Sequence, residues 1–428
     1  MYDINMSIGQ LTAVGAQDKD LTFQPSRTFF QSTYKRHTPF AQEPKTFQFQ
    51  NAVDYGRQAE CTIPRSADLL TKIYLVIDLG ELTTDGVANF SPGSNSGGYV
   101  NDVGRAIIEE ISIEAGSVKY DHLYPEFMHA WEKLSIPKER QLKALTGQHD
   151  DNLDVAADLA TREQRLYIPL EFWFQRDYAS AIPLISLHLT DIKLRVKLKK
   201  KMDIISKEFQ TGFKSDGVTE KTLTSHDLTN TAQIKDMFLL GEFVYLDDAE
   251  RGLFAKKRHK YLVNQVQRRD FSIAEGSTRI SIPIQFNHPT KEFVLLFRKK
   301  SNTDNNKWFN FDGLETGKYH GHAFKDLSIT LNNNDRVEHR DPLYFGILQP
   351  AEHHTSIPES NKVYVYSFAI APESNSPSGS LNLSRIENTR IDLAFSEPLL
   401  EGMDVLVFAR SINMVRIYSG VCSLKWSS

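Results

Sequence analysis

The chain has 428 residues and a net charge of −4, from 50 Lys and Arg against 54 Asp and Glu. This length favours two or three folded cores, and the charge balance excludes the broad basic surface that nucleic-acid binding requires. Two distant cysteines, Cys61 and Cys422, exclude a disulfide framework and a CxxC metal site and fit a reducing compartment. We expect a packed protein that does not bind nucleic acid directly.

The N-terminal segment MYDINMSIGQ lacks the basic and apolar regions of a signal peptide. No apolar run approaches the ~20 residues that cross a bilayer. We expect a protein that is neither secreted by a signal peptide nor membrane-spanning. Residues 1–24 are polar with scattered apolar positions and are predicted to form an N-terminal arm. Asn5, Asn89 and Asn382 match N-x-[ST], a pattern too common to predict glycosylation.

Short β-runs separated by Gly, Pro, Asn, Asp and Ser dominate the chain, which is typical of all-β sandwiches. Residues 167–174 are almost wholly apolar and predict a strand covered on both faces. Pro169 and Pro183 cannot donate to a ladder and should lie at strand starts, edges or bulges. The other predicted strands are 69–79, 107–113, 238–246, 261–266, 280–286, 293–297, 327–331, 363–370, 391–395, 405–409 and 414–418.

Residues 191–199 alternate apolar and basic positions, which predicts a strand with one face on a core. The basic residues indicate a solvated face, with a polyanion site as the less favoured alternative. They are Lys193, Arg195, Lys197 and Lys199.

Three short helices are predicted, and each is expected to pack on the sandwich as a loop helix. The first begins at Pro125 and ends before Pro137, and the second runs from Pro137 to a cap at Gly147. The third begins at Asp247 or Asp248, whose carboxylate can cap it. Asp150-Asp151 and Asp247-Asp248 are adjacent pairs whose side chains point apart, so capping is a better interpretation than acid–base catalysis.

Three blocks of the first half recur in the same order in the second half. LLTKIYLVI at 69–77 is echoed by HPTKEFVLLF at 288–297, and ISIEAGSVKYDHLY at 111–124 by LSITLNNNDRVEHRDPLY at 327–344. LYIPLEF with PLISLHL is echoed by VYVYSFA with SGSLNLS. The offsets of 219, 216 and 197 positions differ only as loop lengths would make them. The order predicts a duplicated β-domain with a boundary near 246–248.

Several of these segments resemble the double jelly-roll major capsid proteins of nucleocytoplasmic large DNA viruses, such as chloroviruses, iridoviruses and marseilleviruses. The resemblance spans nearly the whole chain. It is carried by LTAVGAQDKDLT with TFFQSTYKRHTPFAQE (11–43), IPRSADLLTKIYLVIDL (63–79), LYIPLEFWFQRDYASAIPLISLHLTDIKL (166–194), FNHPTK (286–291), YVYSFAIAPESNSPSGSLNLSRIEN (364–388) and MVRIYSGVCSLKW (414–426).

This resemblance implies an all-β double jelly roll with an arm at 1–24, a first jelly roll at 25–246 and a second at 247–428. It also implies a homotrimer whose six jelly rolls form a pseudo-hexagonal capsomer of an icosahedral shell, made and assembled in the host cytoplasm. Expected partners are further copies, minor capsid proteins and an internal membrane. The loops of the outer surface are short, since the largest of them are 81–98, 207–233 and 299–318, and we therefore expect a compact outer surface. A minor capsid paralogue of the same fold is the alternative.

The jelly roll is also the scaffold of cupin metal enzymes, so the histidines require a test. His320, His322 and Asp326 have plausible ligand spacing, but Asn382 stands where a third histidine would be needed. We expect surface-loop histidines instead. His353 and His354 are likewise expected to be exposed to solvent. No Walker loop, GxSxG or HExxH motif occurs, so we predict no catalytic, cofactor-binding or metal-binding residues and no enzyme activity.

A carbohydrate-binding sandwich is a third class to weigh, because the chain has 46 aromatic residues, from 26 Phe, 16 Tyr and 4 Trp. Most of them fall within strand patterns, where core packing is the expected role. Trp308, in the loop DNNKWFNF, is the best candidate for an exposed contact.

Overall fold

In the computed structural model, the described residues are 22–32, 34–82, 98–116, 118–149, 152–207, 232–358 and 362–426, with 13, 15, 16, 18, 213–214 and 220–221. The chain divides into two units, 1–39 and 40–428. In the first unit, the described aromatic side chains are exposed: Phe23, Phe29, Phe30 and Tyr34. The predicted aspartate pair Asp150-Asp151 and the sequons at Asn5 and Asn89 lie outside the described residues.

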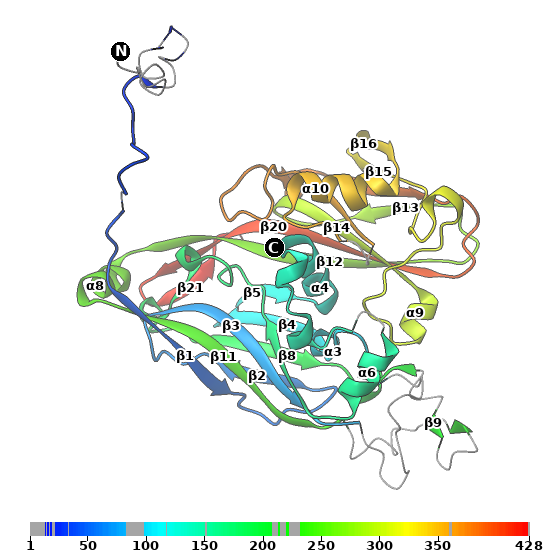
Figure 1. The fold of residues 1–428 in the computed structure, drawn as a ribbon, viewed down its shortest axis with the longest axis horizontal. Helices are drawn as coiled ribbons and strands as arrows, with labels where there is room; N and C mark the ends of the chain where they lie inside the picture. Colours follow the sequence, from blue (N-terminus) through cyan, green and yellow to red (C-terminus); the bar gives the residue numbers. More distant parts are fainter. Residues whose placement is uncertain are drawn as a thin grey trace, which may run out of the picture. The chain divides into compact units, whose positions relative to one another are not determined.

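The strands of the second unit form two halves, coloured blue to green and green to red in Figure 1. In the first half, one sheet has the order β1-β11-β3-β6, with β7 also paired to β3, and the other has the order β2-β8-β4-β5. The strands are β1 (Phe40–Gln48), β2 (Gln58–Thr62), β3 (Leu69–Leu79), β4 (Ile108–Ala115), β5 (Val118–Leu123), β6 (Gln164–Pro169), β7 (Ile182–Pro183), β8 (Ile192–Leu198) and β11 (Ile234–Leu246). A separate hairpin joins β9 (Phe213–Lys214) to β10 (Glu220–Lys221).

The second half repeats this arrangement strand for strand. Its sheets have the orders β12-β20-β14-β17, with β18 on β14, and β13-β19-β15-β16. An added strand, β21, pairs with β20. The strands are β12 (His259–Ile273), β13 (Arg279–Ile284), β14 (Pro289–Lys299), β15 (Asp326–Leu331), β16 (Asn334–Arg340), β17 (Val363–Ser367), β18 (Leu381–Asn382), β19 (Thr389–Ala394), β20 (Met403–Tyr418) and β21 (Val421–Leu424). Both halves are antiparallel sandwiches, which confirms the predicted double jelly roll.

The three sequence echoes fall on equivalent strands. The first pair becomes β3 and β14, and the second becomes the hairpins β4–β5 and β15–β16. The third becomes β6 with β7 and β17 with β18. The pairing register contains a bulge at Thr71 in β3 and at Lys291 in β14. Because these bulges lie 220 positions apart, the structural offset is one residue longer than the offset of 219 that the shared Thr-Lys indicated.

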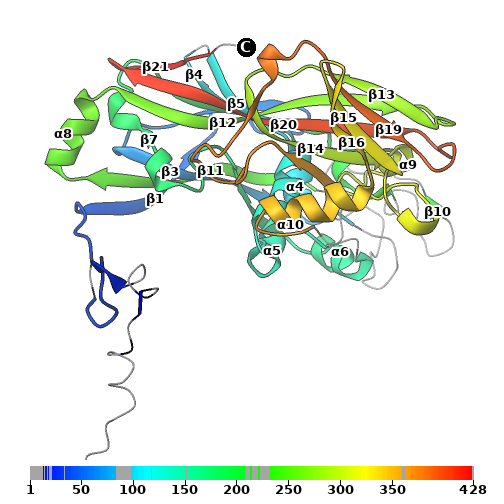
Figure 2. The same cartoon turned by 90° about the horizontal axis from the view of Figure 1, so that it is seen from above.

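Short helices lie between the strands, seen from above in Figure 2. The predicted helix after Pro125 is α4 (Pro125–Ser135). The predicted helix from Pro137 to Gly147 is instead two short pieces, η1 (Lys138–Arg140) and α5 (Lys143–Thr146), with Gly147 in the left-handed conformation at φ 76°. The others are α3 (Val103–Ala106), α6 (Leu153–Ala160), η2 (Tyr178–Ser180), η3 (Leu184–Ser186), η4 (Lys201–Ile204), α8 (Asp248–Lys256), α9 (Lys300–Asp304), η5 (Gly317–Tyr319), η6 (Tyr344–Leu348), α10 (Gln349–His353) and η7 (Leu383–Arg385).

Two further predictions were wrong in detail. The apolar segment 167–174 is not one doubly covered strand, because β6 ends at Pro169 and a turn follows. Pro169 lies on the edge strand of its sheet, as proline requires. The predicted strands 405–409 and 414–418 are one continuous strand, β20, because Ser411 and Asn413 between them are buried and hydrogen-bonded.

The apolar core of the first half continues onto the second half. One cluster of buried side chains joins the interior of the first sandwich to the outer face of the sheet β12-β20-β14-β17. A second cluster fills the interior of the second sandwich. Residues of the outer face are 0–2% exposed, namely Val294, Leu296, Val363, Val365, Leu406 and Phe408. The two jelly rolls therefore share an apolar interface.

Candidate functional site

The interface between the jelly rolls is built on α4 and the end of β5. Phe127, Trp131 and Leu134 recur at helical spacing and give α4 one apolar face, as the sequence predicted. The ring of Phe127 lies 5.6 Å from that of Phe408 on β20. The N–H of Val266 on β12 donates to Asp121 Oδ1 over 3.1 Å. We call this surface of the first half, from Asp121 to Trp131, the docking face.

Glu126 at the start of α4 adds ionic contacts to the same interface. Its carboxylate lies 3.1 Å from Arg268 on β12 and 3.5 Å from Arg298 on β14. Burial opposes ionisation of Glu126, but the charges of Arg268, Lys199 and Arg298 outweigh it and lower its pKa. Both arginines come from the second half, so a buried carboxylate of the first half takes part of its countercharge from the other half.

Trp308 is not the exposed contact that its loop sequence indicated. Its Nε1 donates to the carbonyl of Asp203 in the first half over 2.7 Å, and its ring packs against Lys199, whose Nζ is 4.0 Å from the centroid. The loop after α9 folds back on the first jelly roll, because the indole N–H gains a hydrogen bond there and the ring gains a cation–π contact. Both contacts favour this position of the ring over one in solvent. Trp308 therefore belongs to the internal interface.

His354 was predicted to be exposed, and this was wrong. Its side chain is fully buried, with Nε2 2.9 Å from Glu292 and Nδ1 3.0 Å from Glu373. Burial opposes protonation, but the two carboxylates outweigh it and raise the pKa of His354 to about 9. The neighbouring His353 is partly exposed, and its Nδ1 lies 3.0 Å from the carbonyl of Ile370. Sequence reasoning missed this cluster because its carboxylates lie on β14 and on a distant loop.

A second buried cluster supports α4 from inside the first half. Arg105 Nη1 donates to Asp102 over 2.8 Å and to Glu132 over 2.9 Å, and all three side chains are at most 3% exposed. His129 Nδ1 lies 2.7 Å from Asp102. Burial raises the pKa of Asp102, but Arg105 and His129 reverse this and lower it to about 2. This network fixes α3 against α4 and so positions the docking face.

The residues considered as cupin-type ligands have other partners. His322 is buried rather than on a surface loop, and its Nδ1 lies 3.1 Å from the hydroxyl of Tyr364. His320 is exposed. Asp326 lies 2.7 Å from His339, and Asn382 accepts the N–H of Ser384 at the start of η7. Among the described residues, no group of three His, Cys, Asp or Glu side chains is placed to hold a metal ion.

The remaining sequence candidates are structural. Asp247 caps α8 by accepting the N–H of Glu250, as predicted. The basic residues of β8 alternate with buried ones as predicted, and three of them pair with carboxylates: Lys193 and Arg195 with Glu60, and Lys197 with Glu109. Within the described ranges, no helix is both long and apolar enough to cross a membrane.

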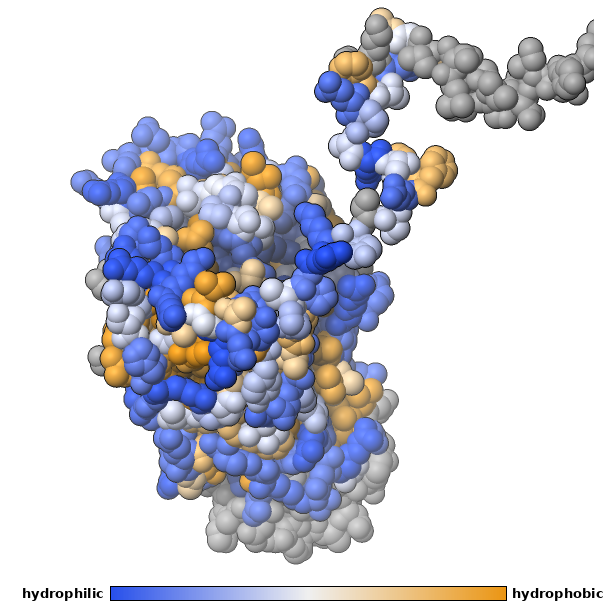
Figure 3. Space-filling model, turned by 90° about the vertical axis from the view of Figure 1, so that its left-hand side faces the viewer, coloured by the Kyte–Doolittle hydropathy of each residue, from blue (hydrophilic) through white to orange (hydrophobic). Residues whose placement is uncertain are grey.

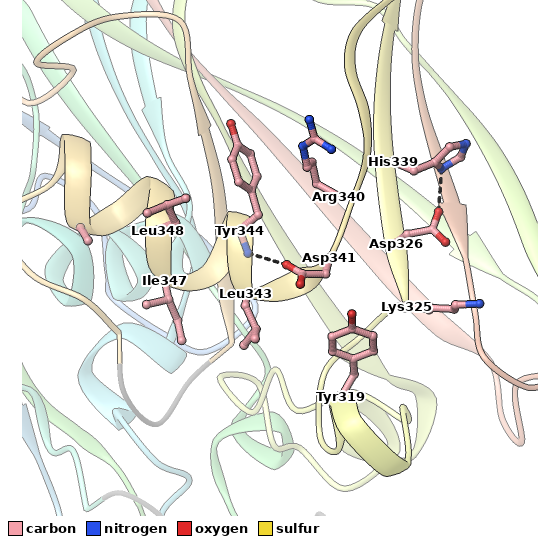
Figure 4. Close-up of a pocket in the computed structure, with 11 residues that line it drawn as sticks. Tyr319, Lys325, Asp326, His339, Arg340, Asp341, Leu343, Tyr344, Ile347 and Leu348 are labelled. Atoms are coloured by element: carbon pink, nitrogen blue, oxygen red, sulfur yellow. Dashed lines mark hydrogen bonds and ion pairs between the residues drawn. The ribbon is translucent and has the colours of Figure 1, made fainter.

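A groove of about 840 Å³ lies beside η6 and α10 on the second half. Figure 4 shows Leu343, Ile347 and Leu348 projecting from the helix, with Lys325 and Asp326 across the hollow. The three apolar side chains are 39–48% exposed. By contrast, the end of the molecule that carries α8 and β21 shows small apolar areas divided by hydrophilic side chains (Figure 3).

Family models of major capsid proteins match both halves of the chain. A family model for the major capsid protein N-terminus matches residues 28–247, and a model for the large eukaryotic DNA virus major capsid protein matches residues 250–423. The major capsid protein of Pyramimonas orientalis virus is 28% identical over 98% of both chains. That of Paramecium bursaria Chlorella virus 1 is 26% identical over 98% of this chain and 99% of the relative.

Solved structures agree in fold. A chain of the quasi-atomic model of the PBCV-1 virus capsid superposes with a TM-score of 0.74 at 23% identity, covering 94% of this chain and 100% of the other. A chain of the Faustovirus major capsid protein superposes with a TM-score of 0.70 at 12% identity, covering 96% and 97%.

Proposed function

The chain belongs to the family of major capsid proteins of large eukaryotic DNA viruses, and from this premise we propose that three copies form a pseudo-hexagonal capsomer of an icosahedral shell. Proteins of this family are structural components of the virion. We propose a purely structural role, without catalytic residues, metal or cofactor, and with assembly in the host cytoplasm.

The observation that supports a trimer most directly is the repeated topology of the two halves. Three chains with two equivalent sandwiches each present six similar units around a threefold axis. Such a ring fills a hexagonal lattice position while each chain keeps distinct surfaces. We propose jelly-roll boundaries of 25–246 and 247–428, in agreement with the family models, which meet between 247 and 250.

We propose that the N-terminal arm, residues 1–24, contacts minor capsid proteins or an internal membrane on the inner side of the shell. The composition of the adjoining segment supports a binding role, because residues 21–42 contain Arg27, Lys35 and Arg36 and no acidic residue. Deletion of residues 2–24 should leave capsomers intact and impair shell assembly. Unchanged assembly would contradict this role.

Light scattering coupled to size-exclusion chromatography tests the capsomer. Three chains of 48.8 kDa give a trimer of about 146 kDa. Negative-stain electron microscopy of the same fraction should show hexagonal particles. A monomer at every concentration would contradict the proposal.

A further inference from the structure

Positive charge is concentrated in two segments of the second half. Residues 251–269 contain seven Lys and Arg and no Asp or Glu, and residues 405–426 contain three Lys and Arg and no Asp or Glu. The chain as a whole has a net charge of −4. The two segments pair as β12 and β20, and β21 extends the pair at the end of the molecule that also carries α8 (Figures 1 and 2). The fold therefore gathers these cations in one place.

The ribbon that β12, β20 and β21 form at this end has one apolar side and one charged side, because side chains alternate along a strand. Val263, Val415 and Ile417 are buried in the core cluster of the first half. The residues between them are exposed on the opposite side, in register across the strands. We call these exposed residues the basic face: Arg258, Lys260, Leu262, Arg416, Tyr418, Val421, Ser423 and Lys425.

Two cations of the basic face are direct neighbours. Lys260 of β12 and Arg416 of β20 are opposite each other in the ladder. Like charges at opposite positions destabilise a strand pair. Arg251 of α8 is paired with Asp68 over 3.0 Å, whereas within the described ranges Lys260 and Arg416 form no ion pair with a carboxylate. Their charges are therefore open to an anion from outside the chain.

Aromatic and aliphatic side chains lie among these charges. Tyr418 and Val421 are 52% and 48% exposed and are opposite each other in the ladder. The guanidinium carbon of Arg258 lies 4.1 Å from the ring centroid of Tyr418, and Lys425 Nζ lies 4.5 Å from that of Trp426.

This mixture of side chains discriminates between two kinds of anionic partner. Lys and Arg beside Tyr and Trp are typical of protein surfaces at the level of lipid headgroups, where the cations meet anionic groups and the rings lie between the headgroups. A bilayer surface also accepts exposed aliphatic side chains such as Leu262 and Val421, whereas a phosphate backbone gains nothing from them. The composition of the basic face therefore favours a membrane over a nucleic acid.

The N-terminal arm joins the second unit at the same end. Phe40, the first residue of β1, pairs with Leu246, which directly precedes the cap of α8. We propose that the basic face binds an anionic lipid bilayer on the inner side of the shell, and this inference rests on the proposed function, which places the arm on that side. Its cations contact the headgroups, and Tyr418 and Trp426 lie between them.

The strength of binding follows from the charges. Each Lys or Arg close to an anionic membrane strengthens binding by about fivefold, and Arg258, Lys260, Arg416 and Lys425 supply four cations. The full chain should therefore sediment with vesicles of phosphatidylcholine that contain about a quarter phosphatidylserine. It should bind pure phosphatidylcholine vesicles far more weakly. Raising the salt from about 0.1 M to about 1 M should release it, because the Debye length falls from about 10 Å to about 3 Å.

The first test is the double variant Lys260→Gln with Arg416→Gln. It should fold at least as well as the wild type, because a like-charge contact is removed, and it should bind the anionic vesicles about 25-fold more weakly. The matched control is Arg162→Gln with Lys300→Gln. This variant loses the same charge from two side chains that are 62% exposed, near α6 and α9 at the opposite end of the molecule (Figure 1). It should bind like the wild type, and equal losses in the two variants would overturn the assigned face.

The second test locates the contact directly. Trp426 is 38% exposed, and its carbonyl accepts a hydrogen bond from Asn413 of β20. Anionic vesicles with brominated acyl chains should quench its fluorescence. Trp426→Phe should bind the vesicles and lose this quenching, because the other three tryptophans are buried or half-buried: Trp131, Trp173 and Trp308. Quenching that persists in Trp426→Phe would place the contact elsewhere and overturn the proposal.

Light scattering of each sample separates this inference from the capsomer proposal. A wild-type trimer that does not bind anionic vesicles would overturn the membrane contact and leave the capsomer intact, whereas a monomer at every concentration would contradict the capsomer. Short duplex DNA at equal phosphate concentration is the competitor. It should leave the vesicles bound, and displacement of the vesicles would assign the basic face to nucleic acid instead.

Discussion

The indole of Trp131 lies against the guanidinium of Arg410, whose carbon is 4.0 Å from the ring centroid. Trp131 comes from α4 of the first jelly roll and Arg410 from β20 of the second. Arg410 is buried, and it donates to the carbonyl of Pro372 over 2.7 Å and lies 3.4 Å from Glu292. A buried cation is thus held by one half and covered by an aromatic ring of the other, which couples the stability of the two halves.

Replacement of Trp131 by Ala should destabilise the chain by about 3–5 kcal/mol, because a buried indole is lost and Arg410 loses its aromatic cover. The free energy of unfolding in urea measures this loss. The control is Trp426→Ala, since Trp426 is 38% exposed near the C-terminus, and it should cost less than about 1 kcal/mol. Equal effects of the two substitutions would show that Trp131 does not join the halves.

Replacement of Arg105 by Ala should destabilise the first jelly roll by about 3–5 kcal/mol, because Asp102 and Glu132 would remain buried without their countercharge. The matched control is Arg165→Ala, which breaks an ion pair with Asp78 that is largely exposed on the arginine side and should cost less than about 1 kcal/mol. Thermal unfolding monitored by circular dichroism compares the two. A small effect at Arg105 would mean that the buried carboxylates take up protons at little cost.

The repeated fold was predictable because its signals are local. β3 has the predicted bounds, Leu69–Leu79, because a long apolar run with β-branched residues needs no distant partner to be recognised. β1 was missed because FAQEPKTFQ is polar and contains Pro44. It forms as the edge strand of its sheet, where proline is tolerated.

The interfaces were less predictable because their residues are distant in sequence. His354 lies 62 positions from Glu292, and no local pattern indicates that the two are buried together. Trp308 had the sequence of an exposed loop, and only tertiary contacts with Lys199 and Asp203 bury part of its ring. The apolar face of α4 could be read from the sequence, but its partner on β20 could not.

The stabilising effect of His354 should depend on pH. Its pKa in the folded chain is about 9, above the ordinary value of 6.5, so its contribution is complete below pH 6.5 and is lost as pH rises through 9. The contribution is of the order of 3 kcal/mol. Burial also lowers the pKa of Lys291 in the same cluster to about 7, so the wild type alone would report two opposing titrations.

The measurement is therefore the difference in unfolding free energy between the wild type and His354→Gln from pH 6 to pH 10. The difference should be largest at pH 6 and should shrink towards pH 10. His339→Gln is the control, because His339 is 69% exposed and pairs with Asp326 on the surface; it should change stability by less than about 1 kcal/mol. A difference for His354→Gln that stays constant with pH would rule out a charged His354.

Substitution of Gly313 by Ala should destabilise the second jelly roll severely. A Cβ at this position would overlap with the carbonyl oxygen of His322 and with Cα of Ala323. These are backbone atoms, held by the hydrogen bond from the Gly313 N–H to the carbonyl of Gly321. The segment that leads into β15 would have to move, which should lower the free energy of unfolding by about 3 kcal/mol or more.

Gly252 provides the opposite case in the same chain. It lies within α8, and a Cβ there meets no atom within 4 Å. Gly252→Ala should therefore stabilise the chain by about 0.5–1 kcal/mol through helix propensity. Both variants are compared with the wild type by urea unfolding. A Gly313→Ala variant as stable as the wild type would contradict the close approach of the Gly313 backbone to the segment before β15. The Gly252→Ala variant tests only the helix propensity of α8.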